Sequence, residues 1–243
     1  VIFEGRDLTG VCEDTPYATR FVDPVEAATA EAEKAVLRAN ASVASSGSSS
    51  GSGNAAASGK MLTCSVRAAT VYGPGESETL IPGLASRAKA RARPVGDGEN
   101  VVDFVYAGNV AHALLLAAEA LLSPAAPSGA VGGNPTPDPS LAAGKAFFVT
   151  DAEPVPYSEF AGRVLSRLGY PRPEDAGGAR GLPVWLAVVF AFLLRVFALV
   201  VSPVFEFRPA LTPLRVAEES TVRRFDVSRA IRELGYAPLW TLE

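Results

Sequence analysis

The chain has 243 residues, 48% of them hydrophobic, so it is long enough to bury one sizeable core in a single domain. Its net charge of -4 argues against nucleic acid as a partner, because phosphate contacts need clustered Lys and Arg side chains. The two cysteines, Cys12 and Cys64, form neither a zinc pattern nor a disulfide framework. We therefore expect no metal site, and a reducing compartment is favoured over secretion.

The chain opens on an apolar stretch, "VIFEG", which has the pattern of a strand already in progress. It carries no initiator methionine and no signal peptide, so we expect that residues precede Val1 in the protein. Further along, strong helix formers with Pro24 at their start and Asn40 near their end predict a helix over 24–40.

Two stretches have the composition of insertions. Residues 41–59 are rich in Gly, Ser and Ala, and residues 123–144 are rich in Pro, Gly and Ala. Neither stretch can bury enough apolar surface to order itself, so both are predicted to be flexible surface loops. The first contains glycines spaced as in a dinucleotide-binding loop, but it follows a predicted helix instead of a strand and is not interpreted as a cofactor loop.

Strand and helix patterns alternate in the rest of the chain. They predict a strand ending in a turn over 61–73, a strand and a helix capped by Asn109 over 101–122, a buried strand over 145–151, a helix over 157–168, and a last helix with Ser228 as its N-cap and Gly235 just past its end. Almost wholly apolar strands that alternate with helices predict a mostly parallel sheet covered on both faces.

The stretch "TVYGPGE", residues 70–76, places two glycines and a proline directly after a predicted strand. It is too short for a phosphate-binding loop, in which several consecutive backbone N–H groups converge on one anion. A plain turn and the rim of a substrate pocket remain open at this point.

A hydrophobic segment covers residues 183–205, and between Val184 and Val201 only Arg195 is polar. On an insertion scale, Leu, Val and Phe at roughly -0.3 to -0.6 kcal/mol each outweigh one Arg at about +3 kcal/mol. We favour a helix that lies in one membrane leaflet, with Arg195 reaching the headgroups, over a helix that spans the bilayer. A fully buried core helix is the alternative.

Five stretches, in order along the chain, carry a family resemblance: residues 1–23, 66–76, 100–121, 145–160 and 225–243. Together they resemble the extended short-chain dehydrogenases, and within them the 3β-hydroxysteroid dehydrogenase group, with the decarboxylating sterol dehydrogenases most similar. The resemblance implies an α/β fold with a Rossmann-type doubly wound parallel sheet and a small C-terminal substrate region. It also implies that the N-terminal half that binds the cofactor lies before Val1.

The resemblance assigns roles to the residues around the Tyr-Gly-Pro turn. Ala68, Ala69, Thr70 and Val71 would face the NAD or NADP cofactor, while Tyr72, Gly73 and Phe104 would belong to the substrate region. Relatives that act on nucleotide sugars usually carry an Arg before the Asp-Phe pair, and this chain has Val102 there, which favours an uncharged lipid. His112 is interpreted as structural.

The family oxidises an alcohol with a Tyr-x-x-x-Lys pair, in which the Lys lowers the pKa of the Tyr base. Aligned on the segments around it, the Tyr position falls on Val25 and the Lys position on Thr29, and neither residue can do this chemistry. The family's catalytic Ser would precede Val1. Tyr17 is the first alternative base, although Phe21 occupies its fourth following position.

The resemblance therefore implies NAD(P)-dependent oxidation of a sterol or steroid 3β-hydroxyl, by a lineage whose catalytic pair is replaced in this chain. The implied partners are a sterol-like lipid, the surface of the endoplasmic reticulum membrane or a lipid droplet on its cytoplasmic face, and a possible homodimer. Two alternatives stay open: a non-catalytic lipid-binding or scaffold homologue, and a dehydrogenase of another steroid or isoprenoid alcohol.

Overall fold

The computed structural model describes residues 2–40, 61–76, 80–90, 93–122, 142–170, 181–201 and 211–242. The insertion predicted at 41–59 lies outside these ranges, and so does the one predicted at 123–144 except for residues 142–144.

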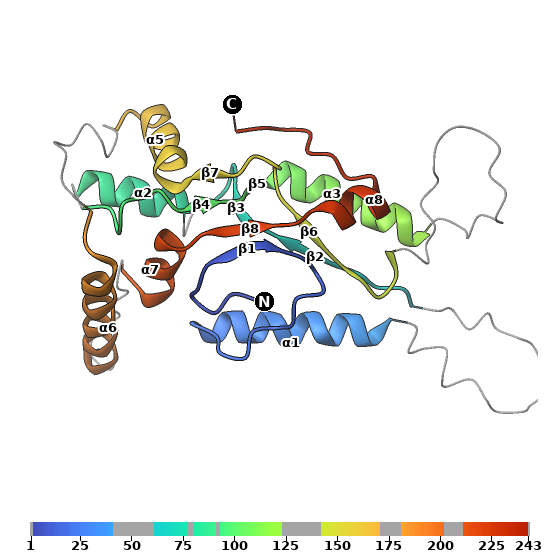
Figure 1. Ribbon diagram of the computed structural model, residues 1–243, viewed down its shortest axis with the longest axis horizontal. Helices are drawn as coiled ribbons and strands as arrows, with labels where there is room; N and C mark the ends of the chain where they lie inside the picture. Colours follow the sequence, from blue (N-terminus) through green and yellow to red (C-terminus); the bar gives the residue numbers. More distant parts are fainter. Residues whose placement is uncertain are drawn as a thin grey trace, which may run out of the picture.

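The strands of the described residues are short and pair mostly in parallel (Figure 1). They are β1 (Leu8–Val11), β2 (Ser65–Ala68), β3 (Thr70–Tyr72), β4 (Val101–Val102), β5 (Phe104–Tyr106), β6 (Ala146–Val149), β7 (Val155–Pro156) and β8 (Arg223–Phe225). Strand β2 pairs with β6 and β3 pairs with β5, both in parallel. A third sheet has the order β1-β8-β4-β7, and its β4–β7 pair is antiparallel. The predicted, mostly parallel arrangement is confirmed.

Helices cover both sides of the β2–β6 pair (Figure 1). Helix α1 (Pro24–Ala39) contacts β2 from one side, and α3 (Ala107–Leu122) and α8 (Ser228–Leu234) lie on the other. Helix α2 (Leu80–Lys89) packs against α5 (Tyr157–Arg167), and α7 (Pro213–Ser220) packs against α6 (Val184–Val201). The layering follows from wholly buried strands such as β6, because both of their faces need a cover.

Helix α1 forms where the sequence predicts it. The Asp23 side chain accepts a hydrogen bond from the Val25 backbone N–H at 2.8 Å, and Pro24 occupies the first turn, where its missing N–H costs nothing. At the other end, the Asn40 N–H donates to the Leu37 carbonyl. The contacts of Asp23 and Pro24 fix the start of the helix, where Val25 and Thr29 lie.

The main core lies between β6 and α3. Phe147 and Val149 of β6 are fully buried there together with Ala113 and Ala117 of α3. Alanines on the inner face of α3 let the helix approach the sheet closely, while Tyr236 closes the cluster and donates its hydroxyl to the Thr150 carbonyl at 2.9 Å. The short buried strand predicted around 145–151 is confirmed.

Two predicted features near the strands are wrong. Residues 2–5 form no strand, and the first strand is β1; Ile2 and Phe3 are nonetheless buried, and both line a cavity. The predicted strand over 61–73 is divided at Ala69 into β2 and β3, because the two parts hydrogen-bond to different partner strands.

Two predicted N-caps are also wrong. Asn109 lies inside the first turn of α3, where its fully buried side chain bonds to other parts of the chain. Ser228 is the first residue of α8, and the Asp226 carboxylate accepts its backbone N–H at 2.9 Å. Asp226 thereby supplies the capping oxygen that the sequence pattern assigned to Ser228. The predicted Gly235 ends the helix in the left-handed conformation, with φ 66°.

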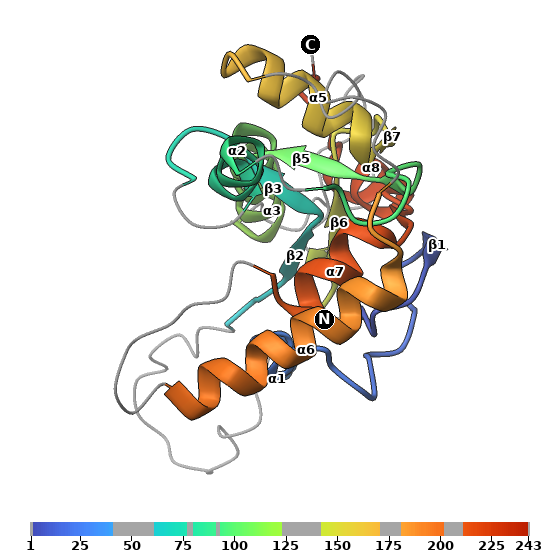
Figure 2. The same cartoon turned by 90° about the vertical axis from the view of Figure 1, so that its left-hand side faces the viewer.

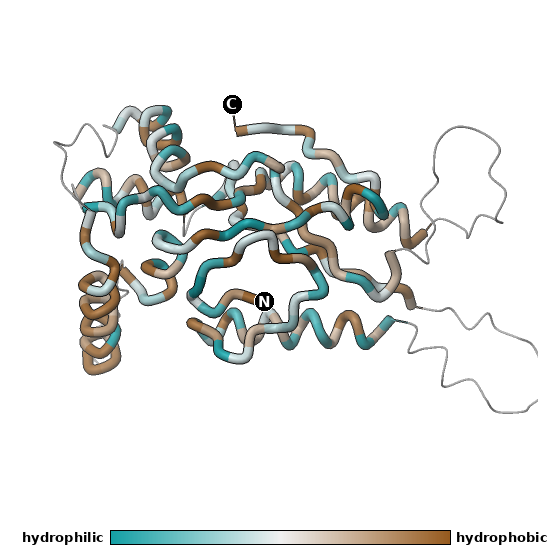
Figure 3. The backbone as a smooth tube through the Cα atoms, in the orientation of Figure 1, coloured by the Kyte–Doolittle hydropathy of each residue, from teal (hydrophilic) through white to brown (hydrophobic). Residues whose placement is uncertain are grey.

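Helix α6 contradicts the alternative of a buried core helix. It buries Ala187 and Ala191 against Val216 of α7, and it exposes most of its large apolar side chains. Trp185 is 69% exposed and Phe192 is 60% exposed. Figure 2 shows α6 extending away from the sheets, and in Figure 3 its backbone has the colour of hydrophobic residues along most of its length. The core helix of a soluble protein would bury its large apolar side chains, whereas α6 buries two alanines and exposes most of the large ones.

Candidate functional site

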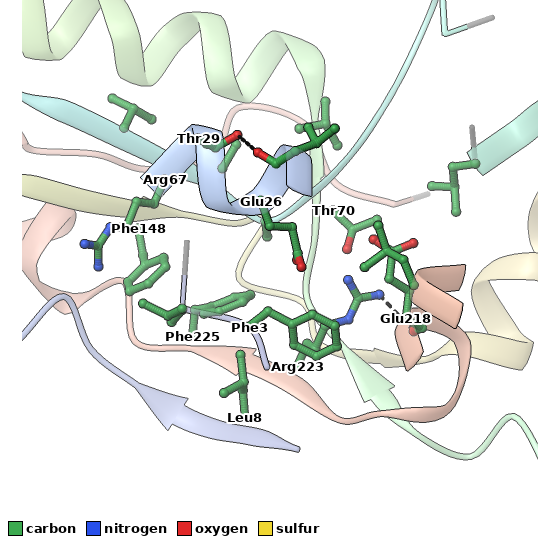
Figure 4. Close-up of a pocket in the computed structure, with 18 of the residues that line it drawn as sticks. Phe3, Leu8, Glu26, Thr29, Arg67, Thr70, Phe148, Glu218, Arg223 and Phe225 are labelled. Atoms are coloured by element: carbon green, nitrogen blue, oxygen red, sulfur yellow. Dashed lines mark hydrogen bonds between the residues drawn. The ribbon is translucent and has the colours of Figure 1, made fainter. Parts of the chain in front are cut away.

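A cavity of about 1130 Å³ lies among α1, β2, β3, α7 and β8 (Figure 4). Three aromatic side chains, Phe3, Phe148 and Phe225, form part of its wall, and the rings of Phe148 and Phe225 stack at 4.8 Å between centroids. Leu8, Leu80 and Leu84 add aliphatic surface. The cavity is thus large, with an apolar part to its wall, and several charged side chains also line it.

The structure brings most of the predicted site positions together at this cavity. The residues that line it include Val25, Thr29, Ala68, Ala69, Thr70 and Val71. The three predicted substrate residues do not line it. Phe104 is 1% exposed and stacks on Phe160 at 3.8 Å, and the Tyr72 hydroxyl donates to the Asp151 carboxylate at 2.9 Å. The roles given to Tyr72, Gly73 and Phe104 stay predictions.

The two replaced positions lie one turn apart at the start of α1. Val25 is 70% exposed, and the Thr29 hydroxyl donates to the Val25 carbonyl at 2.9 Å. The hydroxyl hydrogen of Thr29 is therefore bound to a carbonyl of its own helix. Among the described residues, no Tyr hydroxyl and Lys amine are placed here in the arrangement that the family's chemistry needs.

Tyr17, the alternative base, is held elsewhere. Its hydroxyl donates to Glu33 at 2.7 Å, and the Lys34 amine lies 4.7 Å from its ring centroid. Burial, together with the neighbouring Glu33 carboxylate, raises the pKa of Tyr17, so less of the hydroxyl is ionised and able to accept a proton near neutral pH. The suggestion that Tyr17 serves as the base receives no support from this geometry.

A buried ion pair joins α1 to β2 beneath the cavity. The Arg67 guanidinium donates to Glu33 at 2.6 Å, and the side chains of both residues are more than nine-tenths buried. The hydroxyls of Tyr17 and Ser65 donate to the same carboxylate. Burial by itself raises the pKa of Glu33, but the hydrogen bonds from Arg67 and Tyr17 outweigh it and lower that pKa overall. The group is a fixed support for the start of β2.

A second charged group, formed by Glu26, Glu218 and Arg223, lies in the cavity wall (Figure 4). Arg223 is only 9% exposed, and its Nη2 donates to the Glu218 backbone carbonyl at 3.0 Å. Burial lowers the pKa of Arg223 and raises the pKa values of Glu26 and Glu218. Sequence reasoning missed this group, because no spacing along the chain relates residue 26 to residues 218 and 223.

The Gly-Pro-Gly turn does not form an anion site. The Glu76 carboxylate accepts hydrogen bonds from the backbone N–H groups of Leu80 at 2.5 Å and Ile81 at 2.7 Å. A phosphate at the start of α2 would have to displace this carboxylate. Gly73, at φ 151°, allows a close approach, because a Cβ there would lie 3.0 Å from the Ala107 side chain.

Sequence comparison identifies the family. A sequence model of the 3-beta hydroxysteroid dehydrogenase/isomerase family matches residues 1–177. The chain belongs to this family. The resemblance found in the sequence is therefore confirmed at the family level.

Two relatives of this chain illustrate the match. It is 34% identical over 245 residues to the sterol-4-alpha-carboxylate 3-dehydrogenase, decarboxylating, of Mus musculus, covering 100% of this chain and 58% of the relative. It is 34% identical over 246 residues to the 3beta-hydroxysteroid-dehydrogenase/decarboxylase isoform 1 of Arabidopsis thaliana, covering 100% of this chain and 48% of the relative. The chain spans about half the length of these curated relatives.

Solved structures confirm the fold of this family member. The dTDP-glucose 4,6-dehydratase of Bacillus anthracis, solved in complex with NAD, matches with a TM-score of 0.54 at 14% identity, over 99% of this chain and 55% of that one. The dTDP-glucose 4,6-dehydratase of Streptomyces venezuelae also gives a TM-score of 0.54, at 16% identity, over 98% of this chain and 53% of that one. The predicted Rossmann-type fold of the extended short-chain dehydrogenases is thus confirmed.

Proposed function

We propose that the protein binds a 3β-hydroxysterol, of the 4α-carboxylated type named for its relatives, in the cavity between α1 and β8. The observation that carries the proposal is the meeting of Val25, Thr29 and residues 68–71 on one cavity, as the family resemblance requires. The relatives are named as sterol dehydrogenases and decarboxylases. Its reaction class is the NAD(P)-dependent oxidation of a 3β-hydroxyl.

The described residues fit one end of a dinucleotide cofactor. Ala68, Ala69 and Thr70 have small side chains and line the cavity, so a flat nicotinamide ring can approach the backbone there. When bound, NAD(P) supplies the acceptor for the hydride that leaves an alcohol carbon. The start of α2 does not fit the pyrophosphate, because Glu76 already occupies its N–H groups.

The wall of the cavity favours a rigid lipid. Phe3, Phe148 and Phe225 offer flat apolar surface, and the volume of about 1130 Å³ is slightly above the range of ligand sites, which are typically about 300–1,000 Å³. Burying the apolar rings of a sterol against these side chains supplies the main free energy of binding, at roughly 25 cal/mol per Å².

A non-catalytic sterol-binding homologue is the second candidate. It is favoured by Val25, which carries no ionisable proton, and by Thr29, whose hydroxyl is committed to the Val25 carbonyl. We expect oxidation by this chain to be lost or very slow, because a general base and its tuning group are absent from those positions together. Binding and turnover therefore need to be measured separately.

We place the protein at a membrane surface through α6. By length and composition, α6 is the one helix within the described ranges that could cross a membrane, with a mean hydropathy of 2.7 and 11% of it buried. Its exposed Trp185, Phe190 and Phe192 suit a position within one leaflet. The endoplasmic reticulum membrane or a lipid droplet, at its cytoplasmic face, would supply the sterol.

The test measures sterol binding and locates the site. The chain in detergent micelles is titrated with a radiolabelled 3β-hydroxy-4α-carboxysterol, and saturable binding is expected. Val71→Trp, which fills the cavity, should weaken binding about tenfold or more, whereas Leu114→Trp on the exposed face of α3 should leave it unchanged. No saturable binding would overturn the proposed function, and equal binding by both variants would place the sterol outside this cavity.

A further inference from the structure

Two polar atoms in the cavity wall have no hydrogen-bond partner. They are the Glu26 Oε2 and the Arg223 Nε, both shielded from water, and neither has a partner within the part of the chain that the structure describes. A buried donor or acceptor left unpaired costs about 1–3 kcal/mol, so such atoms are rare in folded proteins. Two of them on one cavity indicate that the cavity wall is built to meet a polar ligand.

The two atoms do not satisfy each other. Glu26 comes from the first turn of α1 and Arg223 from β8, and the described residues contain no ion pair between them. Figure 4 shows the Glu26 carboxylate and the Arg223 guanidinium reaching from opposite sides into the same space, close to the ring of Phe3. The guanidinium carbon lies 5.8 Å from the centre of that ring. Phe3 and the Glu218 carbonyl therefore hold the guanidinium in place, while its Nε has no partner among the described residues.

The pair calls for a ligand that both donates and accepts. Arg223 needs an acceptor, and a carboxylate is the group that matches a guanidinium best. Glu26 Oε2 needs a donor, and a hydroxyl supplies one. A 3β-hydroxysterol with a 4α-carboxylate carries a hydroxyl and a carboxylate on adjacent ring carbons, so one edge of its first ring presents both groups together.

Resting on the proposed function, we infer that Arg223 binds the 4α-carboxylate of the sterol and that Glu26 accepts a hydrogen bond from its 3β-hydroxyl. Arg223 then selects the carboxylated sterol over a neutral one, and Glu26 orients the alcohol. Glu26 and Val25, the position that the family resemblance assigns to the base, both line this cavity from the first turn of α1.

Charge around the site is compatible with an added carboxylate. Arg215 of α7 also lines the cavity, and its guanidinium passes over Gly83 of α2, where a Cβ would lie 2.5 Å from Nη2. The glycine thus leaves room for a second positive group in the cavity wall. Glu33 and Glu219 also line the cavity, but they are paired with Arg67 and Arg87, so Arg215 and Arg223 partly offset the remaining Glu26 and Glu218 carboxylates.

The experiment compares two ligands on the whole 243-residue chain in detergent micelles. One ligand is the 3β-hydroxy-4α-carboxysterol, and the other is its methyl ester, which has the same skeleton without the charge. The chain should bind the acid about tenfold more tightly than the ester, which corresponds to about 1.4 kcal/mol. Arg223→Gln should abolish this preference, and Arg223→Lys should keep part of it, because the charge remains without the two-pronged geometry.

Two further variants separate the roles. Arg224→Gln changes the exposed neighbouring arginine of β8 and should keep the wild-type preference. Glu26→Gln should weaken the binding of acid and ester alike, since both carry the hydroxyl. Thermal melting followed by circular dichroism checks that each variant folds. The ratio of the affinities for acid and ester in the unmodified chain tests the inference without any variant.

Each outcome decides the matter. Equal binding of acid and ester by the unmodified chain overturns the role of Arg223 but leaves sterol binding intact. A preference that survives Arg223→Gln places the carboxylate elsewhere and also overturns it. If neither sterol binds, the proposed function fails, and this inference fails with it.

Discussion

Arg67 and Glu33 form a buried ion pair, with 2.6 Å between Nη2 and Oε1, that joins the middle of α1 to β2. The hydroxyls of Tyr17 and Ser65 also donate hydrogen bonds to the Glu33 carboxylate, which offsets part of the cost of burying its charge. Because α1 carries positions 25, 26 and 29, and β2 leads into residues 68–71, this pair sets the distance between the two main walls of the cavity.

Replacing Glu33 by Gln should lower the free energy of unfolding by about 3–5 kcal/mol at pH 7, because Arg67 would remain buried without a counter-charge. The pKa of Glu33 is held below its ordinary value of 4.5, so its contribution is present above that pH and is lost as the pH falls through the folded-state pKa. The difference in the free energy of unfolding between wild type and variant should therefore become smaller as the pH is lowered.

Urea unfolding from pH 7 down to pH 3 measures this dependence. The matched control is Glu31→Gln on the same helix, which removes an exposed pairing with Lys34 and should change stability little. If the difference in the free energy of unfolding between wild type and Glu33→Gln stays constant across this range, the assigned role of the Glu33 charge is wrong.

The second prediction concerns α6. The double substitution Val189→Asp and Phe192→Asp places two charges on a surface that we expect to lie in lipid, and these positions are 49% and 60% exposed. The protein should then move from the membrane fraction to the soluble fraction, while the unmodified protein should be released by detergent but not by salt. Leu114→Asp with Leu115→Asp on α3 is the control and should not change the partitioning. If the α6 variant stays on membranes, α6 is not the anchor.

The third prediction tests the replaced catalytic pair. The chain is joined to the part of the mouse relative that it does not match, and NAD(P)-dependent turnover of a 3β-hydroxysterol is measured. Val25→Tyr with Thr29→Lys should raise the rate by roughly 10²- to 10⁴-fold, and either change alone should raise it little, because base and cation act as a unit.

Ala27→Tyr with Glu31→Lys repeats the same spacing on another face of α1 and serves as the control; it should leave the rate unchanged. A joined protein that already turns over rapidly without any substitution would show that a base other than position 25 operates.

The fourth prediction concerns Asn109, which links α3 to the strand ends and to the C-terminal segment. Its amide donates to Asp151 at 2.6 Å, and its oxygen accepts from the backbone N–H groups of Leu239 at 2.8 Å and Trp240 at 3.1 Å. Asn109→Ala leaves these groups unpaired, which should cost about 1–3 kcal/mol. Hydrogen exchange should speed up at the amides of Leu239 and Trp240 and stay slow at Phe147 in β6. Unchanged protection at both amides would mean that other contacts hold this segment.

Local patterns predicted the elements whose determinants are local. Helix α1 carries its own cap and its own helix formers, and β6 is an unbroken apolar run, so both appear where they were predicted. The family followed from ordered motifs along the chain. These features can be read from the sequence because residues close together in the chain determine them.

Features that depend on distant partners were missed. Asn109 has the pattern of a cap, and only the fold brings Trp240 within reach of its side chain. Glu26 and Arg223 face one cavity although almost the whole chain separates them, and no periodicity marks such a meeting. The break at Ala69 likewise depends on two different strands that pair on either side of it.

Strand β1 pairs in parallel with β8, with Leu8 opposite Arg223 and Val11 opposite Phe225, and the register shifts between these two pairs. Contacts across this pair extend outward, from Asp7 to the Val222 N–H and from Asp14 to Arg229. The ribosome makes β8 more than two hundred residues after β1, and at about 5–20 residues per second it needs at least roughly ten seconds to supply this partner strand. During that interval the unpaired edge of β1 is open to pairing with other chains. We expect newly made chains to depend on chaperones until Phe225 has emerged.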